Sequence, residues 1–426
     1  MKPIRLFLLL ALVALAALPA AAQTDRCRDG AALFADGLYA EAAEAYACTI
    51  EASPNDPELY RGMITAYLMA GQYYDAEASI SPLRALFTSD DGSSFLEAWE
   101  AGLADSDEPG DQMTRAFVLW ALARDTDAQP IYEQLAAEAE GVPAEFAQVF
   151  SLSSGVWLGN LTGAAAVDSA LALDTANVQV FTFLANTLYF AAGDEDVDAL
   201  TSAALERFAD DPTLLTQRAR SLIRMDRAEE GIALLEQVEA VAPERADLDL
   251  YLTLADAYAA AGDVAGAQSA SDRAVELGAT EGMVIYTLMQ ANENAGEIEA
   301  ASSLALDYLN LSRRVTIRRD VGEGNEGPYS VTMREGLVVE MQFEAADGVP
   351  YTFTAISVNP NEVDPFIVLL DAEGTPIAFN DDRDAAANEY DSLIDQLVLE
   401  GGTYTLVISH AGLGSSGPVE VNIAVF

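Results

Sequence analysis

Between residues 23 and about 312, apolar residues recur with the spacing of amphipathic helices. The segment 251–258 is an example, because its apolar residues fall at positions i, i+3, i+4 and i+7 of one helical face: Tyr251, Leu254, Ala255 and Tyr258. Short turn segments separate such stretches. The pattern predicts an all-α N-terminal part built from paired helices.

The helical region repeats with a period of 34 residues, since Gly37–Ala42 recurs as Gly71–Ala76. The turn positions of this column are Gly37, Gly71, Asp125, Gly159, Gly193, Asp226, Gly262 and Gly296. One interval is 54 residues long, which indicates an insertion in the Gly-, Ser- and Asp-rich stretch 89–110. One helix pair cannot bury its apolar face alone, so about eight stacked pairs are predicted.

These columns resemble the tetratricopeptide repeat. Five residues after the turn, that family has a small residue for close helix packing, and here stand Ala42, Ala76, Ala164, Gly231, Ala267 and Ala301. Pro130 and Asp198 depart from this column. The resemblance implies an all-α helical-repeat superhelix over residues 23–312, in which each repeat contacts its neighbours.

In this family, the first helix of each pair lines a groove at three, six and ten residues before the turn. The resemblance implies a groove for a protein or peptide partner, lined by Arg61, Thr65, Val149, Val156, Phe183, Thr187, Phe190 and Asp256. Burial of Phe183 and Phe190 against the next repeat is the alternative, since apolar stripes are most often core. No lysine follows Lys2, so the carboxylate clamp of chaperone-tail-binding members is absent or reduced.

After Leu311 the helical period ends and short β-rich runs begin. The runs are 338–343, 351–356, 366–370, 393–399, 403–409 and 419–425, separated by turn residues. They predict an all-β sandwich of seven or eight strands over residues 329–426. Residues 313–328 are predicted to form a linker. It starts with the cationic cluster Arg313–Arg319, which either faces solvent or grips an acidic surface.

The C-terminal part resembles the bacterial pre-peptidase C-terminal domain, a jelly-roll-like sandwich of secreted proteins. The matching segments are Asp364–Phe366, Leu369–Asp371, Glu373–Gly374, Ile377–Asp382, Asp391–Ser392 and Gly402–Tyr404. The resemblance implies an accessory module without a catalytic set. A second functional hypothesis makes this sandwich a polysaccharide- or matrix-binding module, with Tyr351 and Tyr390 as candidate exposed aromatic residues.

Oxygen-bearing side chains gather near residue 385: Asn380, Asp381, Asp382, Asp384 and Asp391. Hard cations such as Ca²⁺ require several oxygen ligands. The spacing does not match an EF-hand loop. The stretch is therefore either a site for one calcium ion or a solvated acidic turn in which Asn and Asp side chains cap the backbone. No other cofactor is predicted.

The first residues have the features of a secretory signal peptide. Lys2 and Arg5 precede the apolar run 6–18, and Ala20–Ala22 follow it. Cleavage after Ala22 is predicted, with a retained membrane anchor as the alternative. The protein is then periplasmic or secreted. In that compartment Cys27 and Cys48 are predicted to form a disulfide across the first helix pair; two buried thiols are the alternative.

The net charge is −48, from 69 acidic and 21 basic residues, which argues against a nucleic-acid partner. One histidine and two cysteines are too few for zinc sites built from His and Cys. His410 is the only histidine that could activate Ser409 or Ser415, and Gly322–Gly327 is spaced G-x-G-x-x-G without a preceding strand. The sequence predicts a non-enzymatic interaction protein of undetermined oligomeric state.

Overall fold

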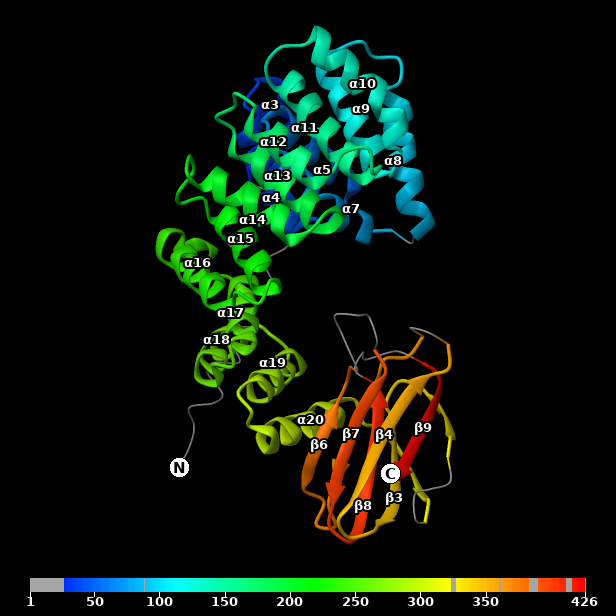
Figure 1. Cartoon of the computed structure of the whole chain (residues 1–426). Helices are drawn as coiled ribbons and strands as arrows, with labels where there is room; N and C mark the ends of the chain where they lie inside the picture. The colour runs from blue at the N-terminus through cyan, green and yellow to red at the C-terminus, as the bar shows by residue number, and fades with distance from the viewer. Residues whose placement is uncertain are drawn as a thin grey trace, which may run out of the picture. The chain divides into compact units, whose positions relative to one another are not determined.

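In a computed structural model of the protein, residues 27–87, 89–322, 327–359, 362–382, 390–410 and 416–425 are described. Helices come first along the chain and strands follow (Figure 1). The chain divides into two compact units between Ser221 and Leu222. The predicted signal peptide, residues 1–22, lies outside the described residues.

The helices follow one another with short connections. They are α3 (Gly30–Ala35), α4 (Tyr39–Ala52), α5 (Pro57–Met69), α6 (Tyr73–Ala78), α7 (Ile80–Ala85), α8 (Ser89–Leu103), α9 (Pro109–Ala121), α10 (Asp125–Glu138), α11 (Val142–Trp157), α12 (Gly163–Leu171), α13 (Val178–Ala191), α14 (Asp194–Leu205), α15 (Pro212–Arg224), α16 (Ala228–Val241), the 3₁₀ helix η1 (Pro243–Arg245), α17 (Leu248–Ala260), α18 (Val264–Glu276), α19 (Glu281–Asn294) and α20 (Ile298–Ser312). No helix in the described part of the chain combines the length and apolarity needed to cross a bilayer.

The backbone at the turn between the two helices of a pair explains why glycine recurs there. It also shows which residue stands at the turn position in each pair. Gly71 has a φ of +73°, a left-handed conformation that glycine adopts without strain. In the third pair this place belongs to Ala123 (φ +56°), because Asp125 already begins α10. The small-residue column therefore passes through the fully buried Ala128, and Pro130 was assigned to it wrongly.

The fourth pair needs the same kind of correction. Its turn is longer, so α12 begins only at Gly163. The buried small residue is Ala166, whereas the predicted Ala164 is exposed. The buried small residue lies three residues after the first residue of the second helix in each of these pairs: Ala42, Ala76, Ala128 and Ala166. The start of that helix is therefore a better reference point than the turn.

The N-terminal unit departs from nearest-neighbour stacking at α6. The backbone N–H of Tyr74 donates to Oε1 of Gln179 at 3.0 Å, which joins α6 to α13 across 105 residues. On the same helix, the Tyr73 ring lies 6.1 Å from that of Phe150 in α11. The predicted insertion supplies α8, whose Leu96 joins the same core. Thus α6 lies against helices that come two and three pairs later in the chain.

The disulfide prediction is confirmed, because Cys27 and Cys48 are bonded with their Cα atoms 5.7 Å apart. Cys48 lies in α4, and Cys27 lies just before the Asp29 side chain that caps α3. The bond therefore ties the start of the described chain to the second helix of the first pair.

The described residues of the second unit include nine strands in two sheets. The strands follow the helices along the chain (Figure 1). They are β1 (Val315–Asp320), β2 (Tyr329–Met333), β3 (Leu337–Ala345), β4 (Val349–Ser357), β5 (Pro365–Leu370), β6 (Pro376–Asn380), β7 (Ser392–Leu399), β8 (Gly402–His410) and β9 (Gly417–Val425). One sheet has the order β1-β3-β8-β5-β6 and the other β2-β9-β4-β7. All neighbours are antiparallel except β1 and β3, which are parallel.

The predicted linker is wrong for residues 315–320, which form edge strand β1. Its arginines bind the adjoining sheet: Arg313 and Arg318 pair with Glu340 at 3.0 and 2.7 Å, and Arg314 pairs with Glu335 at 3.1 Å. The cationic cluster thus contacts carboxylates of its own sandwich.

The last helix pair shares a core with the sandwich, so the predicted boundary at residue 312 does not separate two units. Leu309 of α20 belongs to the same buried cluster as Phe366 of β5 and Val407 of β8. The opposite faces of these strands, with Ile367 and Leu406, pack in the core between the sheets. Strands β5 and β8 are therefore covered on both faces.

Candidate functional site: an aromatic cleft in the N-terminal unit

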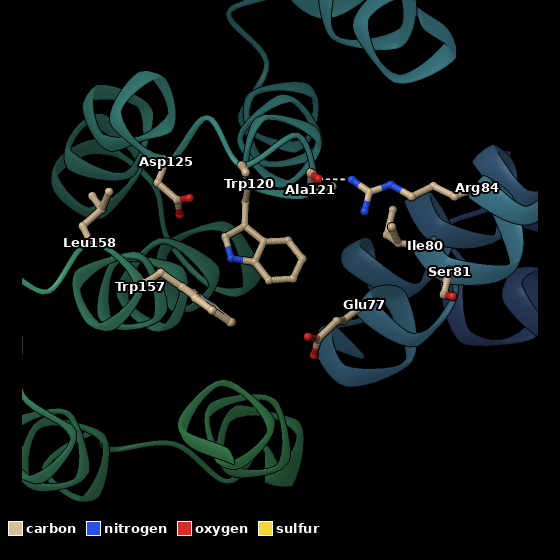
Figure 2. A pocket seen from close by; sticks show the side chains of 10 residues that line it. Glu77, Ile80, Ser81, Arg84, Trp120, Ala121, Asp125, Trp157 and Leu158 are labelled. Carbon is tan, nitrogen blue, oxygen red and sulfur yellow. Dashed lines mark hydrogen bonds between the residues drawn. The ribbon is translucent and has the colours of Figure 1, made fainter. Parts of the chain in front are cut away.

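A cleft of about 570 Å³ opens between α6 and α7 on one side and the ends of α9 and α11 on the other (Figure 2). We call it the aromatic cleft. Its lining residues are Glu77, Ile80, Ser81, Arg84, Trp120, Ala121, Ala123, Asp125, Trp157 and Leu158. The cleft exists because α6 lies against later repeats, so residues as distant in the chain as Glu77 and Leu158 share its walls.

Two tryptophans supply most of its aromatic surface. Trp120 is the penultimate residue of α9, and its ring lies 5.6 Å from Phe150 and 5.7 Å from Phe183. Trp157 is the last residue of α11 and is 48% exposed, followed by Leu158 at 45%. One indole is thus fixed by the core while the other remains accessible. Apolar side chains of this size at the surface are typical of binding sites.

Glu77 of α6 brings a carboxylate to the same hollow. Its Oε1 accepts a hydrogen bond of 2.9 Å from the amide of Asn186 in α13. Its Oε2 is buried and has no hydrogen-bond partner among the described residues. Burial raises the pKa of Glu77 to about 7, although the Asn186 bond opposes this rise. Figure 2 shows the carboxyl group and both indoles directed toward one another across the cleft.

The two other charged residues of the cleft are already engaged. The Arg84 guanidinium donates to the carbonyl oxygen of Ala121 at the end of α9, where a cation also meets the negative end of the helix dipole. Asp125 is buried and accepts a hydrogen bond from the Ser154 hydroxyl. Among the described lining residues, Oε2 of Glu77 is a buried carboxyl oxygen without a hydrogen-bond partner.

Four of the predicted groove residues are buried, so their assignment to an open groove was wrong. They are Val149, Val156, Phe183 and Thr187. The Phe183 ring stacks on Phe150 at 4.3 Å, and the Thr187 hydroxyl lies 2.9 Å from that of Ser153. The recorded partners of Phe183 and Thr187 lie on the first helices of neighbouring repeats, α9 and α11, so for Phe183 the alternative of burial against another repeat holds.

The other four predicted residues are accessible. Phe190 is 67% exposed and lies one helical turn after Asn186, the partner of Glu77. Arg61 and Thr65 line a second cleft of about 520 Å³ in the first repeats. Asp256, in the second unit, accepts a 2.8 Å hydrogen bond from the Thr287 hydroxyl.

Three of the predicted calcium ligands, Asn380, Asp381 and Asp391, accept hydrogen bonds from backbone N–H groups. Oδ1 of Asn380 accepts from the N–H of Leu393 at 2.7 Å, and Oδ1 of Asp391 accepts from Ser357 at 2.8 Å. Oδ2 of Asp381 accepts from the Tyr286 hydroxyl at 3.1 Å. Oδ1 of Asp382 is buried and has no hydrogen-bond partner among the described residues, and Asp384 lies outside them. No metal-binding group of three His, Cys, Asp or Glu occurs in the described ranges, so calcium binding remains a prediction.

The side chains proposed for glycan binding and for catalysis are largely buried. Tyr351 is 2% exposed and its hydroxyl accepts from the N–H of Ala346, so it is not the surface aromatic that was predicted. Tyr390 is half-buried. Ser409 and His410 are both 1% exposed, and the Ser409 hydroxyl donates to the carbonyl of Leu337. Ser415 lies outside the described residues.

Sequence reasoning missed the residues that define the aromatic cleft. Trp120 and Trp157 are two of only three tryptophans, and both lie within the last two residues of the first helix of a repeat. This shared position in the repeat could have indicated from the sequence that the two tryptophans lie close together. The sequence gives no such indication for Glu77, because nothing in the repeat pattern distinguishes it from the many other carboxylates of this acidic chain.

No protein-family model and no curated protein matches the chain. The helical part is similar to solved structures of tetratricopeptide repeat proteins. One is the C-terminal part of such a protein from Cytophaga hutchinsonii, at 17% identity over 61% of this chain and 98% of that chain, with a TM-score of 0.34. Another is from Parabacteroides merdae, at 14% identity over 62% and 95%, with a TM-score of 0.32.

The sandwich is similar to the pre-peptidase C-terminal domain of a collagenase from Bacillus anthracis. The identity is 11% over 26% of this chain and 98% of that domain, with a TM-score of 0.21. Similarity at these identities and scores gives no indication of a shared function. The chain is thus similar to tetratricopeptide repeat proteins in its helices and to a pre-peptidase C-terminal domain in its strands.

Proposed function

We propose that this protein is a non-enzymatic scaffold that is exported from the cytoplasm and binds a segment of a partner protein in the aromatic cleft. The observation that carries the proposal is the exposed apolar surface of this cleft, where Trp157 and Leu158 are 48% and 45% exposed. Phe190 of α13 is 67% exposed and lies one helical turn after Asn186, the hydrogen-bond partner of Glu77. Aromatic side chains in a concave site are frequent anchors of protein–protein binding.

The surroundings of the cleft support the same proposal. Trp120 is held by rings of the core, so a bound segment would meet a wall that is already ordered. A preformed site lowers the entropy cost of association. The disulfide between Cys27 and Cys48 supports export, since such bonds persist in oxidising compartments.

The test compares partner capture by surface variants of the full chain. Wild type and the double variant Trp157→Ala, Phe190→Ser are used as baits in periplasmic extract of the producing organism. The matched control is Val275→Ser, Leu277→Ser, which removes two exposed apolar side chains of α18 and its end. We expect one partner to be retained by wild type and control and lost by the cleft variant. Equal retention by all three proteins contradicts the proposal.

A further inference from the structure

The aromatic cleft has the composition of a site for a cation. We propose that it binds the guanidinium of an arginine side chain, or secondarily a lysine ammonium, with Glu77 as the counter-ion and the indoles of Trp120 and Trp157 as the walls. This inference rests on the proposed function and specifies the chemistry of the partner segment.

One oxygen of the Glu77 carboxyl group has no hydrogen-bond partner among the described residues. This atom, Oε2, is buried at the cleft, while Oε1 is held by Asn186 at 2.9 Å. A buried acceptor without a hydrogen bond costs stability, and an ionised one costs more. A donor cation brought by a ligand would satisfy it, and Asn186 already fixes the direction of the carboxyl group.

The two indoles of the cleft are suited to hold a cation. The face of a tryptophan ring attracts cations within about 6 Å of its centroid, and an arginine side chain can also stack on it. Trp120 and Trp157 come from successive first helices and meet at the hollow toward which Glu77 points (Figure 2). The volume of about 570 Å³ accommodates a long side chain together with part of its backbone.

The charge of the protein is complementary to that of a cationic ligand. The chain carries a net charge of −48, so its field favours cationic segments as partners. Arg84 does not neutralise Glu77, because its guanidinium donates to the carbonyl oxygen of Ala121. Asp125, the other carboxylate of the cleft, adds negative charge to the same lining.

The probe for the test is the blocked peptide acetyl-Ala-Ala-Arg-Ala-Ala-amide, compared with its lysine and citrulline counterparts. Citrulline has nearly the shape of arginine without its charge. Binding to the full chain is measured by titration calorimetry at physiological salt, where screening over about 8 Å suppresses non-specific attraction. We expect one site per chain that prefers arginine to lysine and does not bind citrulline measurably.

Three variants identify the site. Glu77→Gln is expected to weaken the arginine peptide by about tenfold or more, since a charge-assisted hydrogen bond is lost. Trp157→Phe, which keeps a ring, is expected to weaken it by about threefold. Glu138→Gln is the control, because Glu138 also accepts from an amide, Gln134 at 3.1 Å, but on the exposed face of α10. It should leave the affinity unchanged.

The outcomes separate this inference from the proposed function. Equal affinity of wild type and Glu77→Gln for the arginine peptide, or no binding by wild type, overturns the cation site. If the partner captured from extract is retained by Glu77→Gln but lost by the double variant Trp157→Ala, Phe190→Ser, the proposed function holds and the partner does not require the cation site. If that variant retains the partner while the peptide depends on Glu77, the cation site stands and the proposed function fails.

Discussion

Replacing Glu77 with glutamine is predicted to stabilise the N-terminal unit at neutral and alkaline pH. Burial raises the pKa of this carboxyl from 4.5 to about 7, so the folded state resists its ionisation. Since each pKa unit corresponds to 1.36 kcal/mol, the ionised form costs at most about 3 kcal/mol once the pH exceeds 7. Glutamine is neutral at every pH and its Oε1 can still accept from Asn186.

The sign follows from proton linkage. Below pH 4.5 the carboxyl is protonated in both the folded and the unfolded chain, so wild type and variant should differ little. Between pH 4.5 and about 7 only the folded state keeps the proton, so wild type loses stability as the pH rises and the variant does not. For a unit of this size, about 3 kcal/mol corresponds to a melting temperature about 6–12 °C higher at pH 8.

The assay is differential scanning calorimetry of the full chain at several pH values and constant ionic strength. Glu138→Gln serves as the control, because this exposed carboxylate has a comparable amide partner and its loss should change stability by no more than about 0.5 kcal/mol. A gain for Glu77→Gln that is the same at pH 4.5 and pH 8 would refute the reasoning, and so would a lower melting temperature at pH 8.

Three further predictions concern other parts of the chain. Reduction of the Cys27–Cys48 bond should cost about 3 kcal/mol in the first repeat, because the bond closes a short loop, and alkylation followed by mass spectrometry should find no free thiol before reduction. Phe366→Ala should cost about 3–5 kcal/mol in the calorimetric transition of the second unit, because the ring is fully buried between β5 and α20, whereas Val398→Ala on the exposed edge should have almost no effect. CaCl₂ and NaCl at matched ionic strength should raise the melting temperature of wild type equally, because Asn380 and Asp391 already bind backbone N–H groups. A larger rise with Ca²⁺ that the substitution Asp382→Asn abolishes would instead show a specific calcium site.

Much of the architecture was readable from local patterns. The 34-residue period predicted the helix pairs, because the apolar spacing of one helix face and the left-handed turn at Gly71 are local properties. Six of the strands were predicted from β-rich runs between turns. Cys27 and Cys48 were predicted to pair, because a helix hairpin brings residues 21 positions apart close together.

Strands β1, β2 and β6 were missed because their neighbours in the sheet, and not their own sequences, place them there. Residues 315–320 are exposed and rich in arginine, and they extend only because β3 offers a parallel edge. By contrast, the continuous apolar run 366–370 could have indicated from the sequence that this strand is covered on both faces. A strand covered on one face alternates, so an unbroken run indicates cover on both faces, which α20 and the second sheet provide.

The candidate site was decided by tertiary structure. Periodicity can say that Phe183 lies on an apolar face of its helix, but not whether that face opens to solvent or meets another helix. Rings of α9 and α11 bury that face. The contact of α6 with α13, made by Tyr74 and Gln179 across 105 residues, creates the cleft of Glu77, Trp120 and Trp157 elsewhere. Such a contact depends on side chains distant in the chain, so a repeat pattern that describes only neighbouring residues cannot contain it.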